Sequence, residues 1–387
     1  MILIGGSAGN TVKSLDFALL ESWIKSVKEP ETAQRSVFAR LISIYSQTRY
    51  GRMHGAYDID SLEEFREKFP TASYQSLKPY IDMVKAGEYE ALLTEPPEFW
   101  GLTSGTRGPP KLIPITKTDL EVRARVMLKG LMQYVSHWND NEVLRKPCLA
   151  IYLPSRVDEI ECGDRIVPCG YISGIYAECF EKTLGFHVKP SIKTINELGA
   201  GVSKADWERR FEITYDALKD DDVALVIGSV PPLQLFGRWL KRKYGKYPKD
   251  VWDIHLILCS GVAGIWDVYV DSLKKMYGHE TRIIEAYGAT EGTYAQQMDE
   301  NPLLVPFYDT YLFEVETRKG CKMLYEMKAG EWGRLIVSST VLPRYEIGDI
   351  IECYEDGLYF KVHGRATISG LIEYILKRLV FTIAKIF

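Results

Sequence analysis

The stretch FWGLTSGTRGPPKLIPIT, residues 99–116, gathers small hydroxyl side chains, glycines and two cations between two apolar segments. Hydroxyl groups donate hydrogen bonds to phosphate oxygens, and glycines let backbone amides turn toward an anion because no Cβ is in the way. The residues with this chemistry are Thr103, Ser104, Gly105, Thr106, Arg107, Gly108 and Lys111. The stretch therefore predicts a phosphate-binding loop.

Two other interpretations apply to the same loop. Clusters of Gly, Ser, Thr and Pro mark ordinary loops, so a polar turn between a strand and a helix explains the stretch equally well. A Walker-type loop requires Gly-Lys-Ser/Thr after a four-residue spacing. Lys111 instead follows two prolines and precedes Leu112, which excludes the Walker motif.

A second candidate is EAYGATEG at residues 285–292, which follows an apolar segment with the pattern of a strand leaving a parallel sheet. Ligands of open α/β sheets bind at the carboxyl ends of such strands. The motif offers an aromatic ring for stacking on a flat ring system, two small residues for close approach, and a hydroxyl and a carboxylate for phosphate and a divalent metal. In order, these are Tyr287, Gly288, Ala289, Thr290 and Glu291. An ordinary turn is the alternative.

A third candidate is LPRYEIGDII at residues 342–351, which places Asp349 after a glycine between short apolar segments. A carboxylate accepts hydrogen bonds, so Asp349 would take both hydroxyls of a ribose. The alternative is an ordinary turn aspartate, because Asp is common in turns.

In this order and separation, the three stretches resemble the motifs of the adenylate-forming superfamily, which includes acyl-CoA synthetases, luciferases and peptide-synthetase adenylation domains. TSGTRGPPKLIP looks like its phosphate loop, AYGATEG like its adenine and metal motif, and RYEIGD like the segment that carries its ribose-binding aspartate. HGRAT at residues 363–367 resembles the hinge that follows. This likeness implies a ribose or phosphate contact for Arg365.

The N-terminal third is similar to the auxin-responsive Gretchen Hagen family of acyl-acid amido synthetases. The similarity is carried by QTRYGRMHG at residues 47–55 and by LEEFREKFPTASYQSLKPYIDMVKAGEYEALLTEPPEFW at residues 62–100. Members of that family adenylate a carboxylic acid with ATP and pass the acyl group to an amine. Two alternatives stay open: an acyl-CoA ligase that resembles phenylacetate-CoA ligases, and a non-catalytic nucleotide- or acyl-binding protein.

The resemblance implies ATP and Mg²⁺ as cofactors of a ligase, with a role for each matching residue. Thr106, Lys111 and Glu291 would act in catalysis, and Glu291 would hold the metal. The residues expected at the nucleotide are Thr103, Ser104, Gly105, Thr106, Lys111, Tyr287, Gly288, Ala289, Thr290, Asp349 and Arg365.

Candidates for an acyl pocket lie in GYISGIY at residues 170–176 and SGVAG at residues 260–264. Core packing explains both segments equally well. The predicted ligands are a small carboxylic acid and an amine or thiol acceptor. The residues predicted to line the pocket are Tyr171, Ser173, Gly261 and Val262.

Three departures from the family pattern affect these expectations. Arg107 occupies a position where the family more often has a small residue or a hydroxyl, and Glu346 stands where plant members carry arginine. Family members also continue past the hinge into a domain that closes over the site, whereas only residues 366–387 follow Arg365. The resemblance therefore implies a missing closing domain and impaired acyl transfer.

Strands and helices alternate between residues 148 and 286, which predicts an α/β fold with mostly parallel sheets flanked by helices. Residues 12–95 have helical spacing, and short strands after Pro306 predict a small antiparallel β-barrel or sheet. The expected parts are an α/β nucleotide- and acyl-binding domain at 1–305, a small β subdomain with the ribose-binding aspartate at 306–365, and an amphipathic tail at 366–387.

A helix is expected almost directly after the phosphate loop. Thr118 and Glu121 have the spacing of a capping box, and apolar residues continue at helical spacing through Val135. A helix that begins behind an anion-binding loop would add its dipole to the site.

The composition, with 46% hydrophobic residues among 387, indicates a globular protein with a large core. A net charge of −4 gives no basic field for nucleic acid or an anionic membrane. The apolar start MILI is too short for a secretory signal, which predicts a cytoplasmic protein. The cysteines and histidines lack metal-ligand spacing, so no metal cage is expected.

The tail ISGLIEYILKRLVFTIAKIF, residues 368–387, has the pattern of an amphipathic helix. Central Lys and Arg residues make it too charged to span a bilayer, so no transmembrane span is expected. The body of the chain or a second copy would cover its apolar face, and in the second case the tail would form a homodimer. A membrane interface is a further alternative, less favoured because the polar face carries only three basic residues. A truncated or frame-altered gene product is the alternative.

Overall fold

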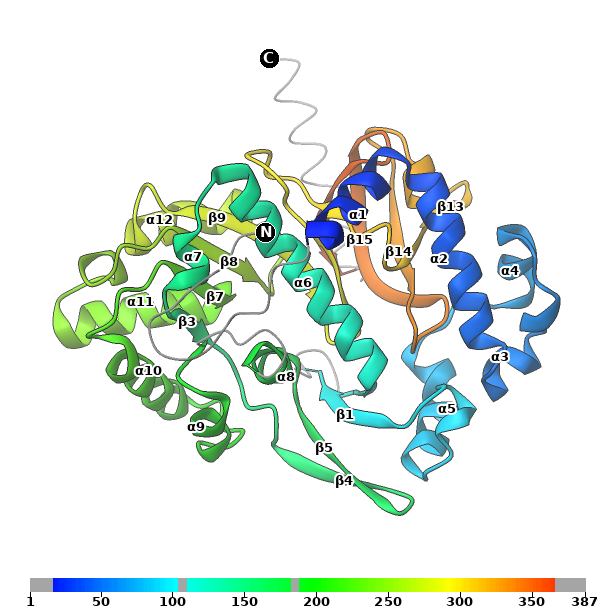
Figure 1. The fold of residues 1–387 in the computed structure, drawn as a ribbon, viewed down its shortest axis with the longest axis horizontal. Helices are drawn as coiled ribbons and strands as arrows, with labels where there is room; N and C mark the ends of the chain where they lie inside the picture. The colour runs from blue at the N-terminus through cyan, green and yellow to red at the C-terminus, as the bar shows by residue number, and fades with distance from the viewer. Residues whose placement is uncertain (1–16, 104–109, 182–187, 366–387) are drawn as a thin grey trace.

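The computed structural model describes residues 17–103, 110–181 and 188–365, which form three β-sheets with helices around them (Figure 1). The predictions for the tip of the phosphate loop, at Ser104, Gly105, Thr106 and Arg107, lie outside these ranges. The amphipathic tail and the first 16 residues also lie outside them.

The largest sheet has seven strands in the order β11-β10-β9-β8-β7-β3-β6. From β9 to β6 the neighbouring strands are parallel, and their apolar residues are buried because helices cover such sheets. The strands are β3 (Cys148–Ile151), β6 (Val188–Lys189), β7 (Leu225–Ser229), β8 (Leu256–Ser260), β9 (Arg282–Ala289), β10 (Gly292–Gln296) and β11 (Val305–Pro306). The predicted parallel α/β sheet is confirmed.

Helices between these strands pack on the sheet. The helix α11 begins with prolines in its first turn and ends at Gly245, whose φ of 72° suits a glycine at a helix C-terminus. The helices of this half are α7 (Glu142–Arg145), α9 (Ile192–Glu197), α10 (Lys204–Leu218), α11 (Val230–Tyr244), η4 (Pro248–Asp250), η5 (Ile265–Tyr269) and α12 (Val270–Tyr277).

A second sheet has four strands in the order β2-β1-β5-β4. The central pair β1 and β5 is parallel, whereas β2 and β4 pair antiparallel with their neighbours. The helix α6 crosses the middle of the molecule between the two halves of the fold (Figure 1) and packs against α8, β2 and β10. These elements are β1 (Pro97–Leu102), β2 (Leu112–Thr116), β4 (Asp158–Cys162), β5 (Arg165–Tyr171), α6 (Lys117–Trp138) and α8 (Ile172–Cys179).

The third sheet is fully antiparallel, with the order β13-β12-β14-β15-β16, and confirms the predicted small antiparallel sheet. Its strands are β12 (Leu312–Thr317), β13 (Gly320–Met323), β14 (Trp332–Ser338), β15 (Tyr345–Glu355) and β16 (Tyr359–Arg365), with η6 (Leu324–Glu326) after β13. N-terminal helices lie beside it (Figure 1). They are α1 (Phe17–Lys28), α2 (Pro30–Tyr45), α3 (Arg49–Met53), η1 (Ala56–Asp58), α4 (Leu62–Lys68), α5 (Tyr74–Lys85) and η2 (Tyr89–Ala91).

The N-terminal helices and the third sheet share one hydrophobic core. The rings of Trp23 and Phe307 lie 4.5 Å apart between centroids. The amide of the buried Gln34 donates to the carbonyls of Tyr308 and Tyr311, both at 2.7 Å. Segments more than 270 residues apart therefore fold together, and the domain boundaries at 305 and 365 stay a prediction.

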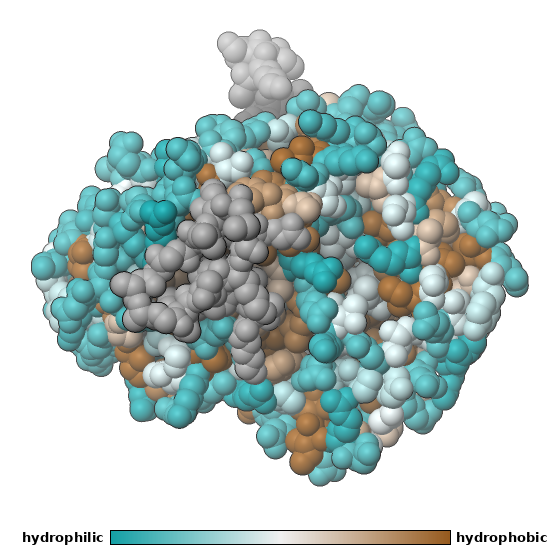
Figure 2. All heavy atoms as spheres, viewed as in Figure 1, coloured by the Kyte–Doolittle hydropathy of each residue, from teal (hydrophilic) through white to brown (hydrophobic). Residues whose placement is uncertain are grey.

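The surface is mixed in character. Figure 2 shows hydrophilic residues over most of one face, with hydrophobic residues in scattered patches. Large apolar side chains that are exposed come from many elements: Met53, Tyr57, Ile166, Val202, Leu235, Tyr244, Val268 and Tyr354. None of the helices in the described ranges combines the length and the apolar character that a membrane crossing requires.

Candidate functional site

The base of the predicted phosphate loop is closed by Thr103 and Lys111. The strands β1 and β2 pair up to Leu102 and Leu112, and the Thr103 N–H then donates to the Lys111 carbonyl at 3.0 Å. In return, the Lys111 N–H donates to Thr103 Oγ1 at 2.8 Å. Because this oxygen accepts from the backbone, the Thr103 hydroxyl keeps its own hydrogen for a ligand.

Lys111 is exposed beside the loop, and its ammonium group lies 5.4 Å from the centre of the Tyr74 ring. The Tyr74 hydroxyl also accepts from the Leu112 N–H at 3.3 Å. This contact fixes the stem of Lys111 near the loop while its charge stays in solvent. Such an exposed cation–π contact contributes about 0.5–1 kcal/mol.

The predicted helix behind the loop is confirmed as α6, but its predicted cap is wrong. The cap of α6 is Thr116, whose hydroxyl accepts from the Asp119 N–H at 3.2 Å, and Thr118 lies inside the helix. Thr116 is at the far end of β2 from the loop, about 17 Å away at ~3.4 Å per strand residue. The dipole of α6 is therefore not directed at the loop.

The motif AYGATEG forms a hairpin in which Ala289 on β9 pairs with Gly292 on β10. Thr290 and Glu291 are its two turn residues. A Cβ on Gly288 would lie 2.7 Å from the Gly292 carbonyl oxygen, so the glycine makes room for the neighbouring strand. The parallel sheet thus ends in this tight turn, at the carboxyl edge where ligands of such sheets bind.

The hairpin turn packs against the end of β1. A Cβ on Gly101 would lie 2.8 Å from Thr290 Cγ2. The structure therefore brings the base of the phosphate loop and the Thr290–Glu291 turn together, although their sequences are almost 190 residues apart.

The predicted ribose motif lies on the paired strands β15 and β16, where Asp349 is opposite Arg365. Asp349 Oδ1 forms an ion pair with Arg365 Nε at 3.2 Å, and its Oδ2 accepts from the Tyr287 hydroxyl at 2.7 Å. Burial and the Asp349 carboxylate raise the pKa of Tyr287, so this hydroxyl stays a donor. A carboxylate oxygen can accept more than one hydrogen bond, so a ligand hydroxyl is compatible with these two contacts.

Tyr287 is not a freely exposed stacking platform. Tyr287 is only 8% exposed. The centre of its ring lies 5.8 Å from the ring centre of Tyr294 and 6.1 Å from that of Phe360. Most of the ring is therefore covered by protein. The predicted stacking on adenine can involve only the small exposed part.

Tyr345 is a site residue that the sequence interpretation missed. It stands in RYEIGD beside the predicted ribose motif, and its hydroxyl donates to Glu291 Oε1 at 3.2 Å. Together with the Tyr287–Asp349 bond, it connects the AYGATEG and RYEIGD motifs by two tyrosine–carboxylate contacts. The adjacency of Tyr345 to the motif was the only sequence signal.

The backbone before Tyr345 is held in an unusual conformation. Arg344 has a φ of 41°, in the left-handed region that non-glycine residues rarely adopt. Ala72, in the N-terminal part, donates to the Arg344 carbonyl and accepts from the Glu346 N–H, both at 2.8 Å. The guanidinium of Arg344 binds Glu314 and the Phe69 carbonyl. These contacts fix the direction in which Tyr345 leaves the turn.

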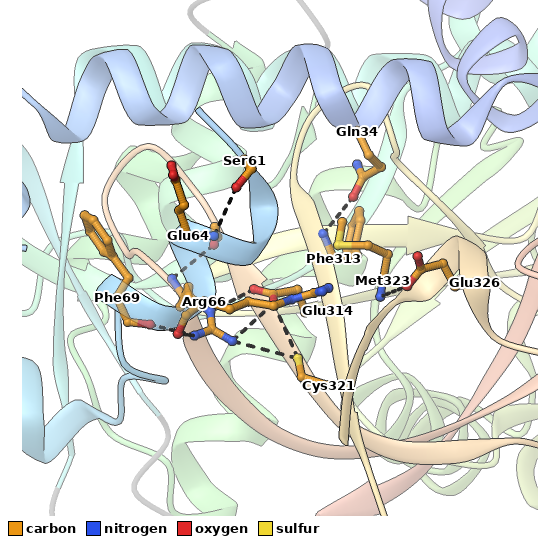
Figure 3. A network of polar contacts seen from close by, with 12 residues as sticks. Gln34, Ser61, Glu64, Arg66, Phe69, Phe313, Glu314, Cys321, Met323 and Glu326 are labelled. Carbon is orange, nitrogen blue, oxygen red and sulfur yellow. Dashed lines mark hydrogen bonds and ion pairs between the residues drawn. The ribbon is translucent and has the colours of Figure 1, made fainter. Parts of the chain in front are cut away.

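The polar network around Glu314 anchors this segment (Figure 3). Arg66 from α4 donates to Glu314 Oε1 at 2.9 Å, and Cys321 lies beside the same oxygen at 3.4 Å. The side chain of Glu314 is only 1% exposed. Helices from the N-terminal part therefore hold a turn that comes from the third sheet.

Glu346, the second departure from the family pattern, pairs with Arg334 on the neighbouring strand β14 at 3.0 Å. This contact lies within the third sheet. Arg107 lies outside the described residues. Whether either departure alters nucleotide contacts stays a prediction.

Of the four predicted acyl-pocket residues, Tyr171 is the last residue of β5, Ser173 lies in α8, and Gly261 and Val262 follow β8. Tyr171 pairs with Leu102 at the end of β1, and Ser173 Oγ accepts from the Leu153 N–H at 3.2 Å. Gly261 has a φ of 92°, and Val262 packs on the core around α11 and α12. The acyl pocket therefore stays a prediction.

A cavity of about 520 Å³ lies elsewhere, between the segment after β3, α8 and α9. It is lined by Arg156, Glu178, Ile192, Lys193, Asn196 and Glu197. None of the predicted site residues belongs to this lining.

Within the described ranges, no group of three or more His, Cys, Asp and Glu side chains is placed to hold a metal ion. Glu291 supplies a single carboxylate next to the hydroxyl of Thr290. Mg²⁺ is commonly bound by one or two carboxylates together with substrate phosphates and water, so this donor set fits a metal that arrives with a nucleotide.

The fold is that of known ligases. It is similar to AtGH3.15 acyl acid amido synthetase in complex with 2,4-DB, with a TM-score of 0.74 at 18% identity over 90% of this chain and 70% of that one. An open conformation of 2-hydroxyisobutyryl-CoA ligase in complex with 2-HIB-AMP and CoA gives a TM-score of 0.61 at 16% identity, over 87% and 76%. The chain therefore has the fold of these two ligases, which agrees with the predicted fold class.

Residues 19–177 match the GH3 family N-terminal domain, which supports the predicted similarity of the N-terminal part to that family. Indole-3-acetic acid-amido synthetase GH3.15 of Arabidopsis thaliana is 37% identical over 110 residues, which are 27% of this chain and 18% of that protein. Indole-3-acetic acid-amido synthetase GH3.2 of the same plant is 25% identical over 115 residues, 29% and 21% respectively. The matched segments thus span about a fifth of these relatives' length.

Proposed function

We propose that this chain binds ATP with Mg²⁺ and adenylates a small carboxylic acid, as in amido synthetases that conjugate acids to amino acids. The observation that carries the proposal is the joining of three separate motifs. Thr290 contacts the end of β1 at the phosphate loop, and the hydroxyls of Tyr345 and Tyr287 connect its hairpin to the strand of Asp349. If the Thr290–Glu291 turn had only a structural role, the phosphate-loop, AYGATEG and RYEIGD motifs would not all need to be present in this order.

In the proposed reaction, a carboxylate oxygen of the acid forms a bond to the α-phosphorus of ATP. The bond from that phosphorus to the oxygen bridging to the β-phosphate breaks, and pyrophosphate leaves with the electron pair. Positioning and charge stabilisation do most of the work in phosphoryl chemistry. Lys111 would neutralise phosphate charge, the Thr103 hydroxyl would donate to a phosphate oxygen, and Asp349 with Arg365 would orient the ribose.

Mg²⁺, when bound, neutralises negative charge on the phosphates. Glu291 would hold it, with water and phosphate oxygens as the remaining ligands. The Tyr345 hydroxyl, 3.2 Å from Glu291 Oε1, would fix the direction of that carboxylate. The assignments of Ser104, Gly105 and Thr106 to the triphosphate belong to this proposal as well, on the basis of the motif alone.

An acyl-CoA ligase is the second candidate, and the fold likeness to 2-hydroxyisobutyryl-CoA ligase favours it. The two candidates differ in the acceptor, an amine or a thiol. Mass spectrometry of reactions with amino acids or with coenzyme A distinguishes them. Acyl transfer is measured separately from adenylation. A location in the cytoplasm and a homodimer are further parts of the proposal.

The test of adenylation is ATP–pyrophosphate exchange with a library of carboxylic acids. Indole-3-acetic acid comes first, because it stands in the names of the GH3 relatives. We expect acid-dependent exchange that requires Mg²⁺. Folded chain that neither catalyses exchange nor binds ATP or AMP in calorimetry, with Mg²⁺ present, would contradict the proposal. Nucleotide binding without exchange for any acid would favour a non-catalytic binding protein.

Asp349→Ala is expected to weaken AMP binding by about 1.5–3 kcal/mol, roughly 10- to 100-fold in Kd, because hydrogen bonds to a charged group are lost. Asp356→Ala is the matched control, since Asp356 is an exposed turn residue between the same two strands and pairs with Lys328. Isothermal calorimetry measures both variants. Equal affinities would mean that Asp349 is a turn residue and that the ribose assignment is wrong.

A further inference from the structure

Arg123 is a fully buried charge in the middle of the amphipathic helix α6. Its side chain is 0% exposed, and its Nε lies 2.7 Å from Oδ2 of Asp119, one helical turn earlier and 1% exposed. Burying two charges is costly, and apolar side chains of similar size often serve the fold as well or better. The pair therefore calls for a role besides packing.

The two terminal nitrogens of Arg123 bind the hairpin turn. Nη1 donates to the Thr290 carbonyl at 2.8 Å, and Nη2 donates to the Glu291 carbonyl at 2.9 Å. These are the two turn residues between β9 and β10. One planar guanidinium thus fixes both peptide groups of the turn, which a lysine ammonium cannot do with the same geometry.

A second helix contributes to the same contact. The Tyr176 hydroxyl, on α8, lies 3.3 Å from Arg123 Nη1 and 3.1 Å from Thr293 Oγ1 on β10. Arg123 on α6 therefore holds the turn through its backbone, and Tyr176 on α8 supports Arg123 and the start of β10. Among the described residues, the Glu291 carboxylate accepts a hydrogen bond from the hydroxyl of Tyr345.

We propose that Arg123 is a positioning residue that fixes the Thr290–Glu291 turn, so that the Glu291 carboxylate is directed at the metal and phosphates of bound Mg·ATP. This inference rests on the proposed function. Arg123 itself does not touch the ligand, and it acts through the two carbonyls. The Asp119 carboxylate pairs with Nε of Arg123 and so keeps the two terminal nitrogens of the guanidinium directed at the turn.

The charge of Arg123 persists across the working pH range. Burial is the largest single influence and lowers the pKa of Arg123, but the Asp119 carboxylate together with Tyr176 and Tyr311 raises this pKa above its ordinary value.

The test compares the unmodified chain with the double variant Asp119→Leu/Arg123→Met. Replacing both buried charges avoids leaving one of them unpaired, so the variant is expected to fold.

In the ligand-free double variant, the protection of the amides of residues 286–296 from hydrogen exchange is expected to fall at least 10-fold. In ATP–pyrophosphate exchange, the half-saturating Mg²⁺ concentration is expected to rise at least 5-fold, with a rate at saturation at least 10-fold lower. The single variant Arg123→Lys should give intermediate values for all three quantities.

Arg210→Met is the matched control. Arg210 is 2% exposed on α10 and donates to the carbonyls of Gly199 and Gly201, in the loop before that helix. Its loss is expected to lower thermal stability without changing the Mg²⁺ dependence. Unchanged hairpin protection and unchanged Mg²⁺ dependence in the folded double variant would overturn the proposal. No pyrophosphate exchange in the unmodified chain, with hairpin protection lost in the variant, would overturn the proposed function but support the positioning role.

Discussion

Glu314→Gln is expected to lower the free energy of unfolding by about 3–5 kcal/mol, the range for removing one partner of a buried ion pair. The Glu314 carboxylate is 1% exposed and accepts from Arg66 Nε at 2.9 Å (Figure 3). It also accepts from Arg344 Nε at 3.0 Å. A neutral amide would leave two guanidinium groups with no anion between them. It would also place an NH₂ group against one of these donors.

Glu316→Gln is the control for this prediction. Glu316 lies two residues further along β12, but its side chain is 41% exposed and pairs with Arg334 at the surface. Its replacement should change the free energy of unfolding by less than about 1 kcal/mol. Urea unfolding followed by tryptophan fluorescence measures both variants. Equal losses of stability would show that the buried network does not anchor the N-terminal helices to the third sheet.

The same network bears on the candidate site, because it holds Arg344 in the left-handed region. A non-glycine residue in this conformation costs about 1–3 kcal/mol and persists only where surrounding contacts enforce it. Tyr345 follows directly and reaches Glu291. Glu314 binds Arg344, and Arg344 directly precedes Tyr345. The buried network around Glu314 therefore also fixes the direction of the Tyr345 hydroxyl in the site.

Local patterns were enough to predict the parallel sheet. The runs around Val226, Leu258 and Ile284 are short, apolar and bounded by turns or helices, and each became a central strand. These strands are buried on both faces, so their sequence is nearly continuous in apolar residues. The short strands after Pro306 alternate with turn residues, and they became the antiparallel sheet.

Contacts between distant segments could not be predicted in the same way. Gln34 had no local signal for its role, since its carbonyl partners are Tyr308 and Tyr311 at the other end of the chain. The pairing of β1 with β5 and the hairpin of β4 with β5 were also missed. Their strands are interrupted by polar and glycine residues, which weakens the periodic signal.

For the candidate site, the sequence supplied the motifs but not the residues that connect them. Asp349 and Glu291 were predicted from their motifs, whereas Tyr345 and Arg123 were not. A sequence signal for Arg123 existed, because it is a charged residue on the apolar face that includes Leu120 and Leu131. Such a residue on a helix face predicts a buried partner, but it does not identify which loop will supply it.

Glu285, two residues before Tyr287 on β9, is expected to make the stability of the protein fall as the pH rises. Burial raises the pKa of Glu285 to about 7 from 4.5, Lys361 opposes this shift, and Asp267 adds to it. Between these two values the folded chain keeps a proton that the unfolded chain has released. Stability from this group is therefore complete below pH 4.5 and is lost as the pH rises toward 7. The shift of the Glu285 pKa corresponds to about 3 kcal/mol in the free energy of unfolding.

Glu285→Gln removes this titration, because an amide carries no charge at any pH. When the pH is raised from 5 to 8, the free energy of unfolding of the variant is expected to increase by about 2.5 kcal/mol relative to that of the unmodified chain. Most of this change should occur below pH 7. Glu280→Gln is the control, since Glu280 is exposed in the loop before β9 and its replacement should change stability by less than about 0.5 kcal/mol at either pH. Urea unfolding at pH 5, 6, 7 and 8 measures the three chains. Parallel stability curves for the unmodified chain and Glu285→Gln would mean that the Glu285 carboxyl is ionised in the folded protein throughout this range, and that water or Lys361 solvates it despite its burial.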